Sequence, residues 1–133
     1  MERRPVKPSP KTCPEKASLR QRALMSYDQA GQVEALFEVL ANDSRLRLLH
    51  EIARREEVCV IDLAAALEMK SQAVSNQLQR LLDKGIVASR RQGNNVFYRI
   101  LDNCVLILLE RGLCLVEETG GRADRPPAPS SPT

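Results

Sequence analysis

The chain has 133 residues, of which 43% are hydrophobic and 3% aromatic, and its net charge at pH 7 is +3. This length favours one domain with an aliphatic core. There is no apolar run of about 18 residues and no apolar stretch behind the basic N-terminus, so we expect neither a membrane span nor a secretory signal, but a cytoplasmic protein. In that compartment the cysteines are expected to be reduced thiols rather than disulfides.

The two ends of the chain differ in composition from its middle. Residues 1–14 are rich in proline and charge, which predicts a flexible basic arm. Residues 119–133 read TGGRADRPPAPSSPT, which predicts a disordered tail. The folded domain is therefore expected to span residues 15–118.

Three helices are predicted in the first half of this domain. Residues 16–40 carry apolar side chains at helical spacing. Asn42 or Asp43 can cap the second helix, because a short side-chain oxygen accepts hydrogen bonds from free backbone N–H groups. A short apolar piece at 58–60 then precedes a short third helix whose leucines point inward.

A fourth helix, predicted to be capped by Ser71, has one apolar face and one polar face. Its apolar positions follow the i, i+4, i+7, i+8 spacing of a buried stripe. Gly85 is expected to end it, because glycine tolerates a positive φ. The opposite face presents amide and hydroxyl groups, those of Gln72, Ser75, Asn76 and Gln79. Such neutral groups can donate to and accept from base edges in the major groove of DNA.

A β-hairpin and a strongly apolar helix are predicted at the end of the domain. Residues 86–101 alternate apolar and polar side chains around a Gly-Asn turn. Arg90 and Arg91 lie beside its tip, within reach of phosphates or a narrow minor groove. The final helix, about 103–118, is apolar on nearly every side. A small domain cannot bury all of that surface on its own core, which indicates a partner subunit.

This order of elements is that of a helix-turn-helix followed by a wing. We therefore expect a mainly α fold with a small β-hairpin wing, in the α+β class, that binds double-stranded DNA. The alternative is that the polar residues of the fourth helix form only a solvated face. The residues expected to contact DNA are Ser71, Gln72, Ser75, Asn76, Gln79, Arg80, Arg90, Arg91, Asn94 and Asn95.

Three segments of the chain resemble one known family. They read LANDSRLRLL, EVCVIDLAAALEMKSQAVSNQLQRLLDKGIV and RRQGNNVFYRILD, and the region 33–118 that holds them resembles the ArsR/SmtB family of metal-responsive repressors. The resemblance implies a winged-helix homodimer with the first and last helices at its interface. It also implies binding to an inverted-repeat operator, release when an inducer binds, and Ser71, Gln72, Ser75 and Asn76 facing the groove. The family often has histidine where Asn76 stands.

The resemblance places one candidate inducer site at the start of the third helix. In the thiolate-rich branch of the family, a Cys-x-Cys followed by Asp occupies this position. Cys59 and Asp62 keep the first and third of these residues, and Ile61 stands at the second. That branch also uses cysteines of the N-terminal arm, so Cys13 from the other subunit is a further candidate ligand.

The resemblance places a second candidate site in the last helix. The zinc-sensing branch has an Asp-x-His and a His-x-x-Glu there, donated by opposite subunits. Here Asp102 is followed by Cys104, Leu115 replaces the second histidine, and Cys114 lies one residue earlier. In an antiparallel helix pair Cys104 would lie near Cys114 of the partner subunit, with Asp102 and Glu118 as additional ligands. Thiolates favour soft ions such as arsenite, Cd²⁺ or Pb²⁺, so a conventional zinc site is not expected.

We therefore predict a dimeric repressor that releases its operator when a soft metal or metalloid ion binds cysteine thiolates. A thiol-based repressor of the same fold, sensing persulfides or oxidants, is the alternative, since two cysteines can form a reversible crosslink. A further alternative is a winged-helix module without ligand control. In that case the cysteines bind no ligand, because a cysteine can serve simply as a small buried hydrophobic residue. An enzyme is not expected, since His50 is the single histidine and no phosphate loop is present.

Overall fold

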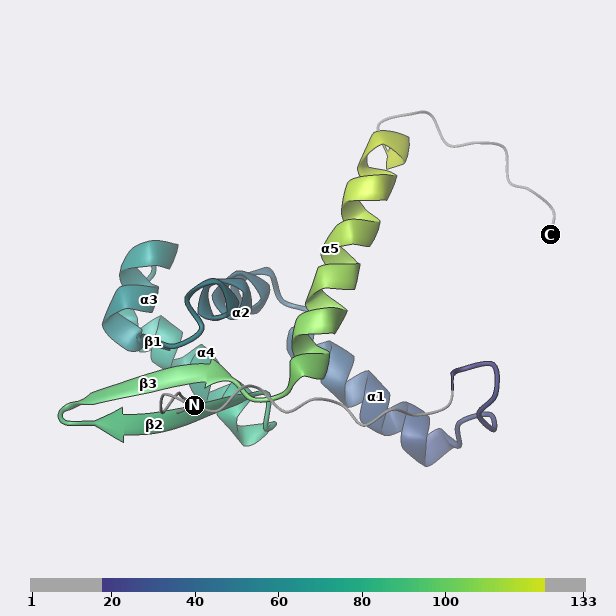
Figure 1. Ribbon diagram of the computed structural model, residues 1–133, viewed down its shortest axis with the longest axis horizontal. Helices are drawn as coiled ribbons and strands as arrows, with labels where there is room; N and C mark the ends of the chain where they lie inside the picture. Colours follow the sequence, from purple (N-terminus) through teal and green to yellow (C-terminus); the bar gives the residue numbers. More distant parts are fainter. Residues whose placement is uncertain (1–17, 124–133) are drawn as a thin grey trace, which may run out of the picture.

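The computed structural model describes residues 18–123, which form five helices and a three-stranded antiparallel sheet (Figure 1). In chain order the elements are α1 (Tyr27–Leu40), α2 (Asp43–Arg55), β1 (Val58–Cys59), α3 (Val60–Leu67), α4 (Ser71–Asp83), β2 (Val87–Gln92), β3 (Asn95–Ile100) and α5 (Asn103–Ala123). Helices α3 and α4 are the helix-turn-helix, and the hairpin β2–β3 is the wing, so the expected mainly α winged helix-turn-helix is confirmed. The arm expected at residues 1–14 lies outside the described residues.

Side-chain caps fix where the first two helices begin. At α1 the Ser26 hydroxyl accepts from the Gln29 N–H at 3.1 Å, and the Gln29 side-chain oxygen accepts from the Ser26 N–H at 3.0 Å. This reciprocal capping box starts the helix at Tyr27, later than its apolar pattern suggests. At α2 the Oδ1 atom of Asn42 accepts from the Arg45 N–H at 3.0 Å, so Asn42 is the cap that is used.

Two residues with positive φ shape the helix-turn-helix. Glu68 ends α3 at φ 56°, and Gly85 follows α4 at φ 72°, as expected of a residue without a Cβ atom. The predicted cap of α4 is wrong. The N-cap is Lys70, which is extended at φ −72° and ψ 145°, so Ser71 is already the first helical residue and no side chain caps this end.

The sheet contains a strand that the sequence pattern did not indicate. β2 and β3 pair along their whole length, and Gly93 takes the positive φ of 64° that their tight turn requires. β1 adds to the other edge of β3, with Val58 opposite Tyr98 and Cys59 opposite Phe97. The base of the wing is therefore joined by backbone hydrogen bonds to the segment that opens α3.

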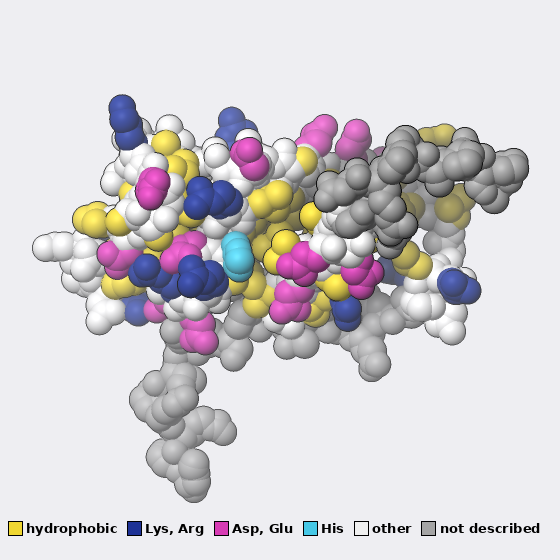
Figure 2. Space-filling model, turned by 90° about the horizontal axis from the view of Figure 1, so that it is seen from above, with side chains coloured by type: hydrophobic (Ala, Val, Ile, Leu, Met, Phe, Trp, Pro, Cys, Tyr) yellow, Lys and Arg dark blue, Asp and Glu magenta, His cyan; other side chains and the backbone are white. Residues whose placement is uncertain are grey.

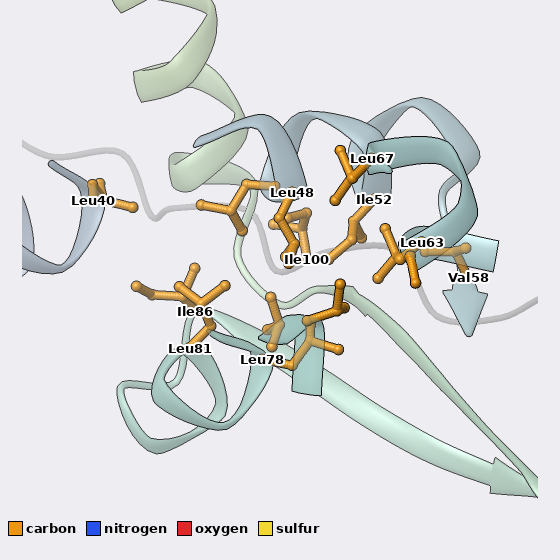
Figure 3. Close-up of a cluster of buried hydrophobic side chains, with 14 residues drawn as sticks. Leu40, Leu48, Ile52, Val58, Leu63, Leu67, Leu78, Leu81, Ile86 and Ile100 are labelled. Atoms are coloured by element: carbon orange, nitrogen blue, oxygen red, sulfur yellow. The ribbon is translucent and has the colours of Figure 1, made fainter. Parts of the chain in front are cut away.

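The core lies where α2, α3, α4 and the base of the sheet meet (Figure 3). Its most completely buried side chains are Leu48, Leu49, Ile52, Leu63, Val74, Leu78, Leu81 and Val87. All are aliphatic, as the shortage of aromatic residues predicts. Burial of one such side chain contributes roughly 1.5–3 kcal/mol to folding. This packing fixes which face of α4 is turned outward.

Helix α5 is longer than expected and only partly packed. It continues to Ala123, so residues 119–123, expected to belong to a disordered tail, are helical. Its first turns pack on the core, and it then rises away from the body (Figure 1). Leu115 and Val116 are 61% and 63% exposed. Within residues 18–123, no helix is long and apolar enough to cross a membrane.

Candidate DNA-binding surface and cysteine sites

The outer face of α4 carries the polar residues predicted to read DNA. Val74, Leu78 and Leu81 are buried against the core, and with a period of 3.6 residues this turns the opposite side of the helix to solvent. The side chains of that face are exposed, except for Ser75, which is half-buried. They are Ser71, Gln72, Asn76, Gln79 and Arg80.

Amide side chains on this face are held by short-range hydrogen bonds. Gln72 Nε2 donates to Asn76 Oδ1 at 3.1 Å, and Gln79 Nε2 donates to Asp83 Oδ1 at 2.9 Å. These pairs are one helical turn apart and order the side chains before any ligand arrives. Each amide has two donor hydrogens and two acceptor lone pairs, so each keeps groups available for a base edge.

The two arginines of the wing are in different environments. Arg90 donates to both carboxylate oxygens of Glu57, Nε to Oε2 at 2.7 Å and Nη2 to Oε1 at 2.8 Å. Its guanidinium also lies 5.2 Å from the centroid of the Phe97 ring and donates to the side chain of Gln92 at 2.9 Å. Arg91 is exposed beside the turn. Arg90 and Arg91 are both predicted to contact phosphates. Among the described residues, the Arg91 guanidinium makes no side-chain hydrogen bond, so it is the one that is both exposed and available.

Glu57 is a contributor that sequence reasoning missed. Its side chain is 8% exposed, against 44% for that of Arg90. It lies 33 positions before Arg90 in the chain, so no local pattern relates the two residues. The hydrogen bonds that Arg90 donates to Glu57 raise the pKa of Arg90, which keeps the guanidinium charged. The pair holds the wing to the turn that follows α2.

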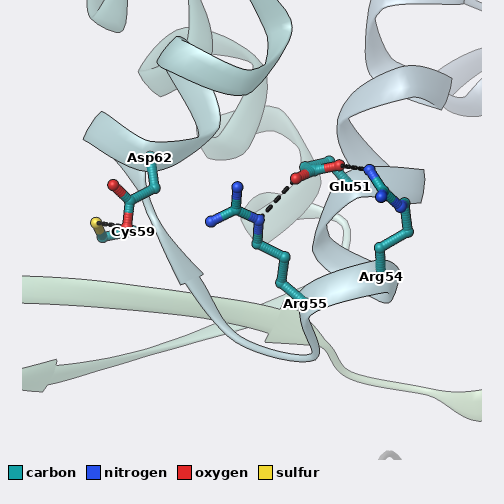
Figure 4. A network of polar contacts seen from close by, with 5 residues as sticks. All are labelled: Glu51, Arg54, Arg55, Cys59 and Asp62. Carbon is teal, nitrogen blue, oxygen red and sulfur yellow. Dashed lines mark hydrogen bonds and ion pairs between the residues drawn. The ribbon is translucent and has the colours of Figure 1, made fainter.

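The first candidate thiol site contains two of its predicted members. Cys59 Sγ donates to Asp62 Oδ2 at 3.5 Å across the start of α3 (Figure 4). The Ile61 side chain between them is 70% exposed and offers no ligand atom. Cys13 lies outside the described residues. A thiol and a carboxylate are therefore together here, and further ligands would have to come from elsewhere.

The second candidate site is spread along α5. Cys114 is exposed, with its Sγ atom 3.9 Å from Glu118 Oε2. Asp102 accepts from the backbone N–H of Cys104 at 2.8 Å and so caps the helix. Ten residues of helix place Cys104 and Cys114 about 15 Å apart along the axis. One chain therefore cannot bring both sulfur atoms to one ion.

The state of the cysteines differs in part from what was expected. Cys59 and Cys114 carry free thiols, whereas Cys104 is disulfide-bonded. The expectation that every cysteine is a reduced thiol therefore fails at Cys104, which lies half-buried in the first turn of α5. Among the residues described, no group of three or more His, Cys, Asp and Glu side chains lies close enough to hold a metal ion within one chain.

Hydrophobic side chains remain exposed on the two helices predicted to form a dimer interface. On α1, Val33 and Phe37 are 38% and 50% exposed. They line a shallow groove together with Met25, Ala30 and Ala41, and Glu34 and Glu38 complete it.

Seen from above, hydrophobic side chains appear between clusters of acidic and basic ones, and the single histidine lies beside basic side chains (Figure 2).

Comparison with known proteins separates the shared core from the rest of the chain. Residues 42–95 match the profile of the MarR family. This stretch holds the helix-turn-helix and β2 but neither α1 nor α5. The chain is 48% identical over 88 residues to a transcriptional repressor SmtB homolog of Synechocystis sp., and the match covers 66% of each chain.

Two solved structures are similar over nearly their whole length. The AntR antimony-specific transcriptional repressor is 59% identical, with a TM-score of 0.71, over 82% of this chain and 98% of that chain. A homodimeric winged helix-turn-helix DNA-binding domain from Mycobacterium bovis, described as a possible ArsR-family regulator, is 31% identical. Its TM-score is 0.64, over 73% of this chain and 92% of that chain. On the fold and these similarities, the chain belongs to the ArsR/SmtB family of metal-responsive winged-helix transcriptional regulators, which are DNA-binding proteins rather than enzymes.

Proposed function

We propose that this protein is a homodimeric repressor that leaves its operator when a soft metal or metalloid ion binds cysteine thiolates. The observation that carries the proposal is the layout of α5. It bears Cys104 near its start, Cys114 about three turns later, and exposed apolar side chains around the second cysteine. A second copy packed antiparallel on this helix covers the apolar surface and completes each thiolate pair.

DNA reading is assigned to α4 and the wing. The exposed face of α4 enters the major groove, with Gln72, Ser75 and Asn76 at base edges and Ser71, Gln79 and Arg80 beside them. Arg91, Asn94 and Asn95 at the wing tip contact the phosphates or the minor groove. In the dimer the two copies of α4 lie about 34–36 Å apart, one turn of an inverted-repeat operator.

The inducer is proposed to bind Cys104 and the partner subunit's Cys114, with Glu118 and Asp102 as additional ligands. Reduced thiolates are soft donors, so they prefer arsenite, antimony(III), Cd²⁺ or Pb²⁺ to harder ions. Antimony is included because the AntR repressor, 59% identical to this chain, is antimony-specific. Cys59, Asp62 and Cys13 form a second candidate site of the same chemistry.

Release from DNA requires that the ion bind one dimer geometry better than the other. An ion that joins the two copies of α5 fixes their distance and angle, and through them the separation of the reading helices. Only the difference in ion affinity between the DNA-competent and the incompetent dimer can shift the equilibrium.

Fluorescence anisotropy of reduced protein on a duplex from upstream of its own gene tests the proposal. The titrants are arsenite, antimony(III), Cd²⁺, Pb²⁺ and, as a harder comparison, Zn²⁺, under anaerobic conditions. Stoichiometric release by one soft ion supports the proposal. Cys104→Ser protein is then expected to bind DNA but to resist release. Normal release of that variant would move the site to Cys59.

A thiol switch on the same scaffold is the second candidate, favoured by the disulfide at Cys104. In this reading an oxidant or persulfide removes two electrons from a thiol pair, and the new sulfur–sulfur bond changes the dimer geometry. Its test is intact-mass analysis with DNA anisotropy of the same samples. DNA release that follows a crosslink and is insensitive to metals would favour this reading over metal sensing.

A further inference from the structure

Arg45, in the first turn of α2, links three helices. Its Nε atom donates to the side-chain oxygen of Gln77 on α4 at 2.7 Å. Its Nη1 atom donates to the backbone carbonyl of Val39 in the last turn of α1. Its own N–H donates to the cap of α2, Asn42. This half-buried residue therefore connects the end of α1 and the middle of α4 through its guanidinium, and the start of α2 through its backbone.

Both acceptors are positions where a charged donor acts strongly. The last carbonyls of a helix have no partner inside that helix and carry partial negative charge. The last turn of α1 contains no basic residue of its own, so Arg45 supplies the cation from the next helix. Gln77 is half-buried on α4, next to Asn76 of the proposed reading face. A planar guanidinium can serve both acceptors at once, which an ammonium group cannot do in the same geometry.

Aliphatic packing turns the polar side of α4 outward, but it does not by itself limit small rotations of the helix about its own axis. Val74, Leu78 and Leu81 hold the helix against the core through non-directional contacts. The Arg45–Gln77 hydrogen bond is directional and lies at the side of this apolar stripe. It can therefore limit the remaining rotation of α4 and set the angle at which its polar side chains meet the groove.

We infer that Arg45 is a positioning residue: it holds the reading face of α4 in a fixed orientation relative to the end of α1. The inference rests on the proposed function in one respect, which is that α1 and α5 form the dimer interface. Through Arg45, a movement of α1 at that interface reaches α4 directly. The residue contacts no DNA and no inducer in this scheme.

The test compares Arg45→Ala with Arg47→Ala, each lacking one positive charge of α2. Arg47 is exposed and makes no side-chain hydrogen bond among the described residues, so it is the matched control. The readout is the ratio of dissociation constants for unrelated and upstream DNA, measured by anisotropy at one salt concentration without metal. Loss of a charged hydrogen bond predicts a ratio about tenfold lower in Arg45→Ala. The ratio in Arg47→Ala should equal that of the wild type.

A double-mutant cycle with Gln77→Ala separates positioning from stability. Gln77→Ala removes the α4 end of the link and leaves the bond to Val39, so it remains informative even if Arg45→Ala fails to fold. We expect Gln77→Ala to lower the ratio about as much as Arg45→Ala, and the double variant to lower it no further. Arg45→Lys, which keeps the charge, should give an intermediate ratio. Equal ratios for Arg45→Ala and Arg47→Ala, or fully additive effects of Arg45→Ala and Gln77→Ala, would overturn the inference.

The same samples distinguish this inference from the proposed function. If the wild-type protein responds to no metal or thiol reagent but Arg45→Ala still loses sequence preference, the proposed induction is wrong and the positioning role stands. If the wild type is released by a soft ion while the ratio for Arg45→Ala is unchanged, the positioning role is wrong. With both correct, the soft ion that releases the wild type in the titrations changes DNA affinity by a smaller factor in Arg45→Ala than in the wild type, because the coupling free energy is reduced.

Discussion

Glu51 is a buried carboxylate whose charge is balanced by its own helix. It is 7% exposed and accepts from Arg54 at 2.8 Å and Arg55 at 2.7 Å (Figure 4). Burial alone raises the pKa of Glu51, but the hydrogen bonds from Arg55 and Arg54, together with their charges, lower it below the ordinary value of 4.5. The ionised form is therefore the one that the fold stabilises.

The lowered pKa of Glu51 predicts a specific pH dependence of stability. Its contribution is fully present above the unfolded pKa, for which 4.5 is the ordinary value, and is lost as pH falls through the lower folded pKa. Glu51→Gln should therefore be less stable than the wild type near neutral pH, by about 1–3 kcal/mol. The difference should shrink as pH is lowered through about 4. Urea unfolding across this range measures it, and a difference independent of pH would contradict the assignment.

At the scale of elements, the parts of the fold with local sequence signals were predictable. The apolar stripe of α4 and the Gly-Asn turn of the wing each depend on residues a few positions apart, and the structure has both. Strand β1 has only two residues, Val58 and Cys59, too few for an alternating pattern. The end of α5 was misplaced because Gly120 is unfavourable in a helix by propensity alone.

The side-chain contacts that orient the site could not be predicted in the same way. Arg90 and Glu57 are 33 positions apart, and Arg45 and Gln77 are 32 apart. Such pairs meet only because β3 and α2 bring distant segments together, and no periodicity marks them. The polar face of α4 was recognisable from its residue types alone, whereas the Arg45–Gln77 contact, to which we assign its fine orientation, has no pattern in the sequence.

For the wing, the Glu57–Arg90 pair predicts opposite effects of two substitutions on DNA binding. Arg91→Ala should weaken binding to all sequences alike. The slope of log affinity against log salt concentration should become shallower by about one unit, the value for one lost phosphate contact. Glu57→Gln leaves Arg90 less neutralised, so non-specific affinity should rise and the slope should steepen by at most about one. Anisotropy titrations at several salt concentrations give both values.

Glu68→Gln is the control for this pair of variants, since it removes the same charge from an exposed position that makes no side-chain hydrogen bond among the described residues. A general electrostatic effect would make Glu68→Gln and Glu57→Gln behave alike. Under the arrangement described here, Glu57→Gln changes the salt slope more than Glu68→Gln does.

At the scale of the whole molecule, the exposed apolar surface of α1 and α5 predicts the oligomeric state. A second copy packed on α5 would bury Leu115, now 61% exposed, and a carboxylate there would be costly to bury. Leu115→Glu should therefore weaken the dimer and, through loss of the paired reading heads, lower DNA affinity at a given protein concentration. Sedimentation velocity measures the first effect and anisotropy the second.

Ile61→Glu provides the comparison for that experiment. Ile61 is 70% exposed but lies on α3, away from α1 and α5. Its substitution adds the same charge to an apolar position that is at least as exposed as Leu115 and should leave the sedimentation coefficient unchanged. A dimer that survives Leu115→Glu would place the interface elsewhere.

The short length of β1 has a mechanical consequence for the wing. Three strands lie side by side only as far as the Cys59–Phe97 pair, which is also where Arg90 is paired with Glu57. Beyond this level the hairpin is a two-stranded ribbon, and such ribbons twist more readily than wider sheets. The base of the wing is thus stiff and its tip compliant, with Arg91 and Asn94 on the compliant side. Such a tip can follow differences in groove width along a DNA site while the three-stranded base keeps the reading helix still.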